Sequence, residues 1–498
     1  TKSRYLRGLT CEKLLWLGWH EPTPYEEQPP GSPAALGTLV GEQAHNLFEG
    51  GVLVDEKPWA HRQAVATTEE LMADPSVWTI FEAAFEFEDI RVRVDALERL
   101  DHGEWGIREV KSGTRVKEEN IDDAAVQLYV LRNSGVTVPS VEIVHTDRTY
   151  VRGPDGIDWP SFFTRSDVTA DVEELQDDVA REVTAQFEIL DETSAPDIEP
   201  SRHCPDHCDY WDRCTADKPE FWALKLPRMQ QERFLELLDM GIEDIRDIPE
   251  AFDLTEIQRR ARQTVTTGQP YLSPRLADVL QPLDGPVLYL DFEAMNPAIP
   301  LYEGMSPYQR VPFQWSLHMA DRTDHVTHRE FLADPAGGDP RRQFAETLLA
   351  AVSERDGPVA VYSSYESSVL GELAEIFPDL RGGLSALVAR LFDLLPIIRE
   401  HVYLPEFYGS FSIKTVGPAL APDFGYDDLD DVRDGAAAAQ AYWRLATNTL
   451  MKNEDPAALR RALRDYCARD TLAMIAVHKG LERLIDETRE PMAAAMVG

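Results

Sequence analysis

Apolar and polar residues alternate over much of the first third of the chain. Residues 85–113 alternate and break at the turn-like sequence DHGE, which is typical of paired strands. A helical pattern follows at 121–133, and residues 141–146 indicate a further strand. Residues 1–60 and 170–190 have mainly helical patterns. Two paired strands, a helix and a further strand between flanking helices predict an α/β core.

The rest of the chain divides into a helical stretch and a second α/β unit. Residues 216–284 carry no strand signal and predict two or three short helices, with Gly241 at a turn. This stretch resembles a helix-hairpin-helix element that grips DNA phosphates, and an ordinary helical linker is the alternative. From Pro286 onward the pattern predicts a helix over 341–354, mainly helices after residue 364, and four strands over 287–294, 313–320, 328–333 and 357–364. We therefore expect three parts: 1–215, 216–284 and 285–498.

The balance of charge is strongly acidic. Lysine and arginine number 49 against 88 acidic residues, which gives a net charge of −39. This is the reverse of the usual footprint of a nucleic-acid-binding protein. We interpret the excess first as adaptation to a salt-rich, halophilic cytoplasm, where a screening length of about 3 Å at 1 M salt mutes self-repulsion. Mimicry of nucleic acid, binding of basic partners and simple solubility are the alternatives.

The distribution of apolar residues predicts no membrane segment. No run of 18 apolar residues occurs, and the opening sequence TKSRYLRGLT lacks an apolar stretch of the signal-peptide type. The sequence also begins without methionine, so we expect that a few residues precede it. A cytoplasmic location is the resulting expectation.

Two predicted neighbouring strands carry two acids and a lysine. Asp95 lies in VRVDAL, and Glu109 and Lys111 lie in IREVKSG. Residues two apart on a strand face the same side, where Asp95 on the partner strand can meet them. Two close carboxylates need a divalent cation to offset their repulsion, and a nearby lysine can orient or activate water. The set predicts phosphodiester hydrolysis, with an ordinary cross-strand ion pair as the alternative.

Two further polar residues strengthen this prediction. His45 lies in GEQAH on an upstream helix, and Gln127 lies on the helix after the second strand. With them, residues 1–215 resemble the PD-(D/E)xK superfamily, in particular its RecB-like iron–sulfur nucleases. The resemblance implies a restriction-endonuclease-like fold in which Lys111 positions the attacking water and Gln127 fills the glutamine motif. It also implies that Mg²⁺ or Mn²⁺ is held by His45, Asp95, Glu109 and the carbonyl of Val110.

Four of the five cysteines form a candidate metal site. Three lie within eleven residues, and a fourth lies far upstream: Cys204, Cys208, Cys214 and Cys11. In a cytosolic protein this clustering indicates a metal site before disulfides. Four thiolates suit a [4Fe–4S] cluster or tetrahedral zinc, with His203 and His207 as spare zinc ligands, while free buried cysteines are the alternative. The irregular spacing resembles that of RecB-type iron–sulfur nucleases, which implies a cluster that joins the two ends of the domain.

A second carboxylate set lies in the last part of the chain. The strand VLYLDFEAM carries Asp291 and Glu293 on one face, and a late helix carries Tyr466 and Asp470 four residues apart. This combination resembles the DnaQ-like 3′–5′ exonucleases of RNase H-like fold, in their DEDD tyrosine subtype. The resemblance implies that the three acids hold two cations about 4 Å apart and that Tyr466 orients the water. Glu366 stands where that family has a metal-binding aspartate.

Other residues have weaker signals. Asp393 and Lys414 fall at recurrent polar positions of the family, and helix capping or surface pairing is the alternative. Cys467 is expected to be a packed thiol without a partner. Three aromatic residues are candidates for stacking on a terminal base, a contact of about 1–3 kcal/mol: Tyr308, Phe313 and Trp315. Core packing is the expected role of at least one of Phe313 and Trp315.

The combined architecture resembles a group of bacterial and archaeal proteins that join a RecB-like iron–sulfur nuclease to an RNase H-like exonuclease domain. The expected function is metal-dependent hydrolysis of DNA, as an exonuclease on single strands or ends, in repair, recombination or defence. One alternative keeps one site active and makes the other a binding platform. Another is an acidic scaffold or nucleic-acid mimic without hydrolytic activity. RNA stays open as a substrate.

Overall fold

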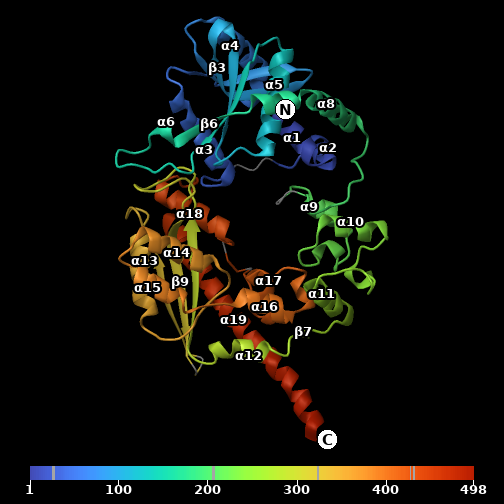
Figure 1. The fold of residues 1–498 in the computed structure, drawn as a ribbon, viewed down its shortest axis with the longest axis vertical. Helices are drawn as coiled ribbons and strands as arrows, with labels where there is room; N and C mark the ends of the chain where they lie inside the picture. The colour runs from blue at the N-terminus through green and yellow to red at the C-terminus, as the bar shows by residue number, and fades with distance from the viewer. Residues whose placement is uncertain are drawn as a thin grey trace. The chain divides into compact units, whose positions relative to one another are not determined.

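A computed structural model describes the protein at residues 1–24, 28–204, 208–321, 323, 325–426, 428–429 and 432–497. The chain forms two compact α/β units (Figure 1). The first comprises Thr1–Ala216 with Asn296–Gln309, and the second comprises Asp217–Met295 with Arg310–Gly498. None of the helices in the described ranges combines the length and apolar character that a bilayer-spanning segment requires.

The first unit is built on a six-stranded sheet whose strands follow one another in chain order. Neighbouring strands are antiparallel except for the parallel pairs β1–β2 and β4–β5. The strands predicted over 85–113 and 141–146 are present, whereas the hydrophobic pattern gave no signal for β1 and β6. The strands are β1 (Val52–Leu53), β2 (Thr79–Phe87), β3 (Ile90–Arg99), β4 (Trp105–Lys111), β5 (Ser140–Thr146) and β6 (Phe163–Asp167).

Helix α5 connects β4 to β5 and packs on the sheet. Its residues Ala124, Leu128 and Leu131 are fully buried in the main core of the unit. Full burial of one leucine side chain contributes about 1.5–3 kcal/mol to the stability of the fold, so packing of this helix stabilises the unit. The helices of the unit are α1 (Lys2–Thr10), α2 (Glu12–His20), α3 (Pro33–Ala44), η1 (His45–Leu47), η2 (Pro58–Ala60), α4 (His61–Ala73), η3 (Asp101–Gly103), α5 (Glu118–Asn133), α6 (Trp159–Phe162), α7 (Thr169–Glu174), α8 (Gln176–Asp191) and α9 (Trp211–Thr215).

The second unit has a five-stranded sheet of order β10-β9-β8-β11-β12. Strands β8, β9 and β10 are antiparallel neighbours, whereas β11 and β12 run parallel to β8. A separate antiparallel pair, β7 with β13, corrects the expectation that 216–284 contains no strand. The strands are β7 (Tyr271–Leu272), β8 (Val287–Met295), β9 (Val311–Ala320), β10 (Val326–Leu332), β11 (Val359–Val361), β12 (Leu391–Asp393) and β13 (Val402–Tyr403).

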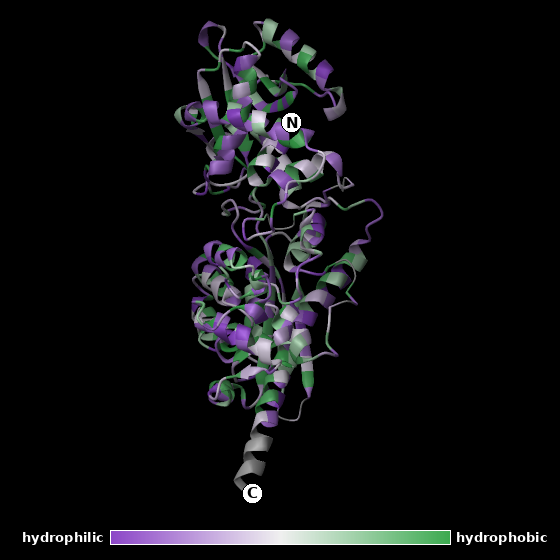
Figure 2. Ribbon diagram, turned by 90° about the vertical axis from the view of Figure 1, so that its right-hand side faces the viewer, coloured by the Kyte–Doolittle hydropathy of each residue, from purple (hydrophilic) through white to green (hydrophobic). Residues whose placement is uncertain are grey.

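Helices surround this sheet, and the long helix α19 packs against β8 and β9. Hydrophilic and hydrophobic residues interleave along the helices of each unit, as amphipathic helices on a buried sheet require (Figure 2). The helices are η4 (Ala223–Lys225), α10 (Gln231–Asp239), η5 (Ile245–Asp247), α11 (Glu256–Thr267), α12 (Leu276–Leu280), η6 (Gln281–Leu283), α13 (Arg341–Val352), α14 (Tyr365–Ile376), α15 (Arg381–Val388), α16 (Leu394–His401), η7 (Pro405–Phe407), α17 (Ile413–Leu420), α18 (Gly435–Thr447) and α19 (Pro456–Val497).

The turn at Gly241 does not join two α-helices directly. Gly241 has a φ of 73°, and the chain then forms the one-turn helix η5 before α11 begins at Glu256. The backbone around this turn pairs with its own unit, since the amide of Ala223 donates to the Glu243 carbonyl at 2.7 Å. The one-turn helix η5 stands where a helix-hairpin-helix element would have its second helix, and phosphate binding at this turn stays a prediction. The stretch is not a detached linker, because Trp222 and Phe234 share one hydrophobic core with the rest of the second unit.

Residues 296–309 leave the end of β8 and fold as part of the first unit. Ala298 is buried in a hydrophobic cluster with Val144 and Phe162. The amide of Arg152 donates to the Met305 carbonyl at 2.9 Å, and the amide of Gly304 donates back to Arg152 at 2.8 Å. Residues 296–309 therefore complete the first unit, although the chain on either side of them belongs to the second unit.

Candidate functional site

The first carboxylate cluster lies where β3 and β4 run side by side. The register pairs Ala96 with Arg108, so the next position sets Asp95 opposite Glu109. The Val110 amide donates to Oδ2 of Asp95 at 2.7 Å and fixes that carboxylate at the strand. Lys111 follows two residues after Glu109 and points to the same side. The strand pairing therefore brings together the acid–acid–lysine set that the sequence predicts.

Two lysines bridge the acids of this cluster. Nζ of Lys111 donates to Oε1 of Glu109 at 2.8 Å and also to Asp123. Nζ of Lys2 lies 2.9 Å from Oε1 of Glu109 and 3.2 Å from Oδ1 of Asp123. The side chains of Glu109 and Asp123 are only 2% and 5% exposed. We name this group the β3–β4 cluster: Lys2, Asp95, Glu109, Lys111 and Asp123.

Helix α5 supplies the amide that completes the cluster. Nε2 of Gln127 donates to Oε2 of Glu109 at 2.8 Å and to Oδ1 of Asp123 at 3.2 Å. Asp123 and Gln127 are four residues apart on α5, so both face the sheet. This four-residue spacing could have indicated from the sequence alone that Asp123 lies beside Gln127. Lys2 gives no comparable signal, because it approaches from a remote part of the chain.

Burial and the lysines shift the two strand acids in opposite directions. Burial, followed by the nearby charge of Glu109, raises the pKa of Asp95 to about 8. Burial also favours the neutral form of Glu109, but Lys2 and Lys111 outweigh it and hold the pKa of Glu109 below its usual range. The same acids outweigh the burial of Lys111 and hold the pKa of that ammonium above its usual range. Lys111 is consequently charged at neutral pH.

A cavity of about 910 Å³ opens beside the cluster, and we call it the β3–β4 cavity. His45 lines it from η1, just after α3 ends, and stacks on Phe81 with the ring centroids 3.8 Å apart. Burial lowers the pKa of His45, which favours the neutral imidazole. Glu82 also lines the cavity, opposite Asp95 in the β2–β3 register and with a φ of 56°. The sequence pattern gave no signal for Glu82.

The second carboxylate cluster joins the end of β8 to α19. Ligand oxygens of Asp291, Glu293 and Asp470 all lie within 4.8 Å of one another. Among the described residues, this is the one group of three or more histidine, cysteine or acidic side chains with such spacing. A register shift opposite Glu293 and Ala294 leaves one extra residue of β9, Phe313, without a partner on β8. We name the three acids the β8–α19 cluster.

Two tyrosines hold Asp470. The hydroxyl of Tyr426 donates to Oδ1 of Asp470 at 2.7 Å, and Tyr466 makes a further hydrogen bond to the same carboxylate. Burial and the surrounding acids hold the pKa of Tyr466 above its usual range, so its hydroxyl keeps its proton. Nζ of Lys414 lies 5.1 Å from the centroid of the Tyr466 ring. Tyr426 lies in a loop far from both motifs, and its position in the sequence did not indicate a role.

Negative charge in the β8–α19 cluster is poorly balanced. Burial, followed by the charge of Asp470, raises the pKa values of Asp291 and Glu293 well above their usual ranges. Lys414 is the cation that lowers the pKa of Glu293 most. Sγ of Cys467 lies 3.5 Å from Oδ2 of Asp291, which corrects the expectation that this thiol lacks a partner. Buried acids with raised pKa values favour binding of protons or cations.

Glu366 and Asp393 lie near the β8–α19 cluster. Glu366 is 3% exposed at the start of α14, and burial raises its pKa to about 8. The charge of Asp393 raises that pKa further. Asp393 caps α16 by accepting a hydrogen bond from the amide of Leu395 at 2.9 Å. Asp393 therefore caps a helix, which was the alternative to its role as a recurrent polar position of the resembled family.

The predicted base-stacking residues have different environments. Phe313 is fully buried and stacks on Tyr442 with the centroids 4.1 Å apart, and Trp315 is 3% exposed. Neither ring is open to a base, so both residues have the core-packing role that was expected of at least one of them. Tyr308 is 37% exposed, and its hydroxyl donates to the Ser112 carbonyl at 2.6 Å.

The four predicted cysteine ligands line one small cavity of about 30 Å³. Leu14, Leu17 and Tyr210 pack around them. Burial raises the pKa of Cys214, and the other three thiols raise it further. His203 lines an adjoining cavity, whereas His207 lies outside the described residues. We name this group the four-cysteine site: Cys11, Cys204, Cys208 and Cys214.

Comparisons with known proteins match parts of the chain. Residues 288–412 match a domain of unknown function, DUF2779. An uncharacterized protein of Ureaplasma parvum serovar 3 (strain ATCC 700970), UU173, is 25% identical over 237 residues, which cover 43% of this chain and 33% of that protein. The chain thus matches about a third of that relative's length. No solved structure matches the chain. The DUF2779 match includes Asp291 and Glu293 and ends before Asp470.

Proposed function

We propose that this chain is a metal-dependent phosphodiester hydrolase that acts on single strands or ends of DNA. The second unit is proposed as a DnaQ-like exonuclease domain and the first as a RecB-like nuclease domain. The observation that carries the proposal is the convergence of Asp291, Glu293 and Asp470 within 4.8 Å. A scaffold without hydrolytic activity has no need to bury three acids at that distance, because burial of like charges costs stability.

The arrangement of strands supports the proposed domain types. Three antiparallel strands followed by two parallel ones support an RNase H-like fold for the second unit. In the first unit, Asp95 and Glu109 on adjacent strands, with Gln127 on the next helix, support the PD-(D/E)xK assignment. RNA stays open as a substrate, because no group in either cluster has been tied to a 2′-hydroxyl.

In the second unit, the residues that would hold Mg²⁺ or Mn²⁺ are Asp291, Glu293 and Asp470, with Glu366 nearby. Such cations supply positive charge that stabilises the attacking and leaving oxygens of a phosphodiester. Tyr426 and Tyr466 fix Asp470 through two hydrogen bonds. Tyr466 also keeps its proton, so its hydroxyl can orient a water molecule. Lys414, which lies over the ring of Tyr466, adds a positive charge that acts on Glu293.

In the first unit, Asp95, Glu109 and the Val110 carbonyl would hold the cation, with the neutral His45 imidazole in the same cavity. Gln127 fixes Glu109 by its hydrogen bond of 2.8 Å. Lys111 is charged at neutral pH and therefore positions water or phosphate rather than removing a proton. The four-cysteine site is proposed to hold a [4Fe–4S] cluster, or zinc as the alternative, and to join Cys11 near the start of the unit to the cysteines near its end.

A second candidate function keeps hydrolysis only in the second unit. Lys2 and Lys111 already contact Glu109 and Asp123, two of the three acids of the β3–β4 cluster, which leaves less uncompensated charge to attract a cation. In this alternative the first unit binds a strand without cutting it.

The test is cleavage of single-stranded DNA labelled at the 5′ or the 3′ end, with Mg²⁺ or Mn²⁺ and at low and high salt. Lys111→Ala and Asp291→Ala should each remove one class of products, and the double variant should remove both. Lys117→Ala, an exposed lysine paired with Glu119, is the matched control and should cleave normally. If neither Lys111→Ala nor Asp291→Ala lowers cleavage, the proposal fails. The second candidate function is supported if Lys111→Ala cleaves as well as the unmodified protein while Asp291→Ala does not.

A further inference from the structure

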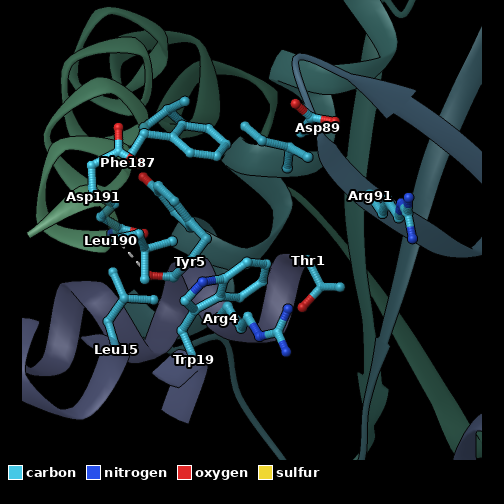
Figure 3. A pocket seen from close by; sticks show the side chains of 13 residues that line it. Thr1, Arg4, Tyr5, Leu15, Trp19, Asp89, Arg91, Phe187, Leu190 and Asp191 are labelled. Atoms are coloured by element: carbon cyan, nitrogen blue, oxygen red, sulfur yellow. Dashed lines mark hydrogen bonds between the residues drawn. The ribbon is translucent and has the colours of Figure 1, made fainter. Parts of the chain in front are cut away.

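A second cavity in the first unit, of about 400 Å³, lies outside both carboxylate clusters (Figure 3). The rings of Tyr5, Trp19 and Phe187 reach it from α1, α2 and α8. Trp19 is 48% exposed and Phe187 is 39% exposed, so the two rings offer accessible faces. We name it the aromatic cavity. Its volume lies within the range of about 300–1,000 Å³ that is usual for small-molecule sites.

Charged groups of both signs surround the aromatic walls. Arg4 and Arg91 contribute guanidinium groups, and Asp89 and Asp191 contribute carboxylates. The guanidinium of Arg4 lies 4.5 Å from the centroid of the Trp19 ring. Arg91 also lies 3.2 Å from Glu86, at the surface. A ligand that fits here needs a flat apolar face and an edge with both donors and acceptors, which is the chemistry of a nucleobase.

The aromatic cavity lies next to the β3–β4 cavity in the first unit. Thr1 and Arg91 line both cavities. Arg91, Arg93 and Asp95 alternate along β3 and therefore face the same side of the sheet. The hydrogen bonds that the structure describes for Arg93 all go to backbone carbonyls, those of Val54, Glu82 and Glu56. Arg91, Arg93 and Lys57 are positive groups along this cavity that can contact a phosphate backbone, and the acids among them would face the cation of the proposed function.

We propose that the aromatic cavity binds one unpaired base of a nucleic-acid strand whose backbone lies in the β3–β4 cavity. The inference rests on the proposed function, since it assigns a position to part of the substrate. A base in a duplex hides both its faces and its pairing edge, so the site selects single strands. Arg91 and Asp95 are four residues apart, which is about 13 Å along a strand. About four nucleotides of a stacked strand, at 3.4 Å each, cover that distance.

The first test measures binding in the full-length Lys111→Ala/Asp291→Ala protein without divalent cations, so that cleavage cannot interfere. Fluorescence anisotropy of a labelled single strand gives the Kd. Trp19→Ala should weaken binding about 5- to 150-fold, the contribution of one base–aromatic stack, and Phe187→Ala should weaken it in the same direction. Trp78→Ala removes a tryptophan that is 61% exposed and lines neither cavity, and it should leave the Kd unchanged. Equal Kd values for Trp19→Ala, Phe187→Ala and Trp78→Ala would overturn the inference.

The second test locates the base. A single abasic nucleotide is moved along the strand, and one position should weaken binding to the parent protein by the same factor as Trp19→Ala. In Trp19→Ala that position should no longer matter, because the stack is already absent. An abasic effect that persists in Trp19→Ala would overturn the inference.

The two tests separate this inference from the proposed function. Cleavage by the unmodified protein, together with insensitivity of binding to Trp19→Ala, rejects the base site alone. A base-dependent signal at Trp19 without any metal-dependent cleavage upholds the base site and rejects hydrolysis.

Discussion

The two carboxylate clusters differ in how their negative charge is balanced. In the β3–β4 cluster, Lys2 and Lys111 contact Glu109 directly, so Glu109 is ionised despite its burial. In the β8–α19 cluster, burial and then the charge of Asp470 raise the pKa values of Asp291 and Glu293. Glu109 is thus neutralised by lysines of the chain itself, whereas Asp291 and Glu293 depend on protons or added cations. Glu109 and the buried acids of the second unit should therefore respond to substitution and pH in opposite directions.

The largest expected effect is the loss of Glu109 from the balanced cluster. Without metal at pH 7, Glu109→Gln should lower the free energy of unfolding by about 3 kcal/mol, because Lys2 and Lys111 lose one of the two carboxylates that they share and keep only Asp123. The folded-state pKa of Glu109 is lowered, so its stabilisation is present above the usual value of 4.5 and declines as the pH falls below it. Chemical denaturation at several pH values measures this. An equal loss at pH 7 and at acid pH would contradict the charge balance.

Added cations should act chiefly on the second unit. Mg²⁺ or Mn²⁺ at 100 times its Kd should stabilise that unit by about 2.7 kcal/mol, since cations bind the folded acids. Thermal unfolding with and without metal measures the shift, and Asp291→Asn should abolish most of it. Asp239→Asn, at an exposed site in the same unit, is the control. A shift of equal size in Asp291→Asn would show that the cation binds elsewhere.

Glu366 should behave in the opposite way to Glu109. Its folded-state pKa is raised from 4.5 to about 8, so the unfolded chain loses its proton first and stability falls as the pH rises between these values. Glu366→Gln should therefore stabilise the metal-free protein at pH 8, with the gain vanishing near pH 4.5. Urea unfolding at the two pH values checks this. A loss of stability at pH 8 would place Glu366 among the balanced acids.

The smallest expected effect distinguishes the two tyrosines on Asp470. Tyr466→Phe should lower the kcat of the second site about tenfold, which corresponds to one hydrogen bond to a charged group. Tyr426→Phe should instead raise the cation concentration needed for half-maximal activity, because Tyr426 only holds Asp470. Cleavage rates over a metal titration separate the two outcomes. Identical behaviour of both variants would assign them the same role.

Short-range patterns predicted the strands that carry the acids. Alternation located β2, β3 and β4, and the spacing of Asp95, Glu109 and Lys111 then followed from strand geometry. Phe313 and Trp315 both pack in the core, as was expected of at least one, because β9 lies between β8 and β10 and is buried along nearly its whole length. In such a strand, aromatic residues on both faces pack in the core.

Contacts between remote segments could not be predicted from one sequence. Lys2 reaches Glu109 across 107 residues, and Tyr426 reaches Asp470 across 44. Neither pair has a periodicity or a motif that links its members. The positive φ of Glu82 is a tertiary effect of the same kind, because strand propensity disfavours that conformation.

The segment 296–309 has a consequence for the order in which the chain is made. A nascent chain that has reached Ala216 still lacks Ala298 and the backbone partners of Arg152. At about 5–20 residues per second, translation needs roughly 5 to 20 seconds more to deliver this segment. During that interval the apolar residues around Val144 and Phe162 lack the segment that buries them in the folded unit. The amino-terminal half therefore matures only after the strand bearing Asp291 has left the ribosome.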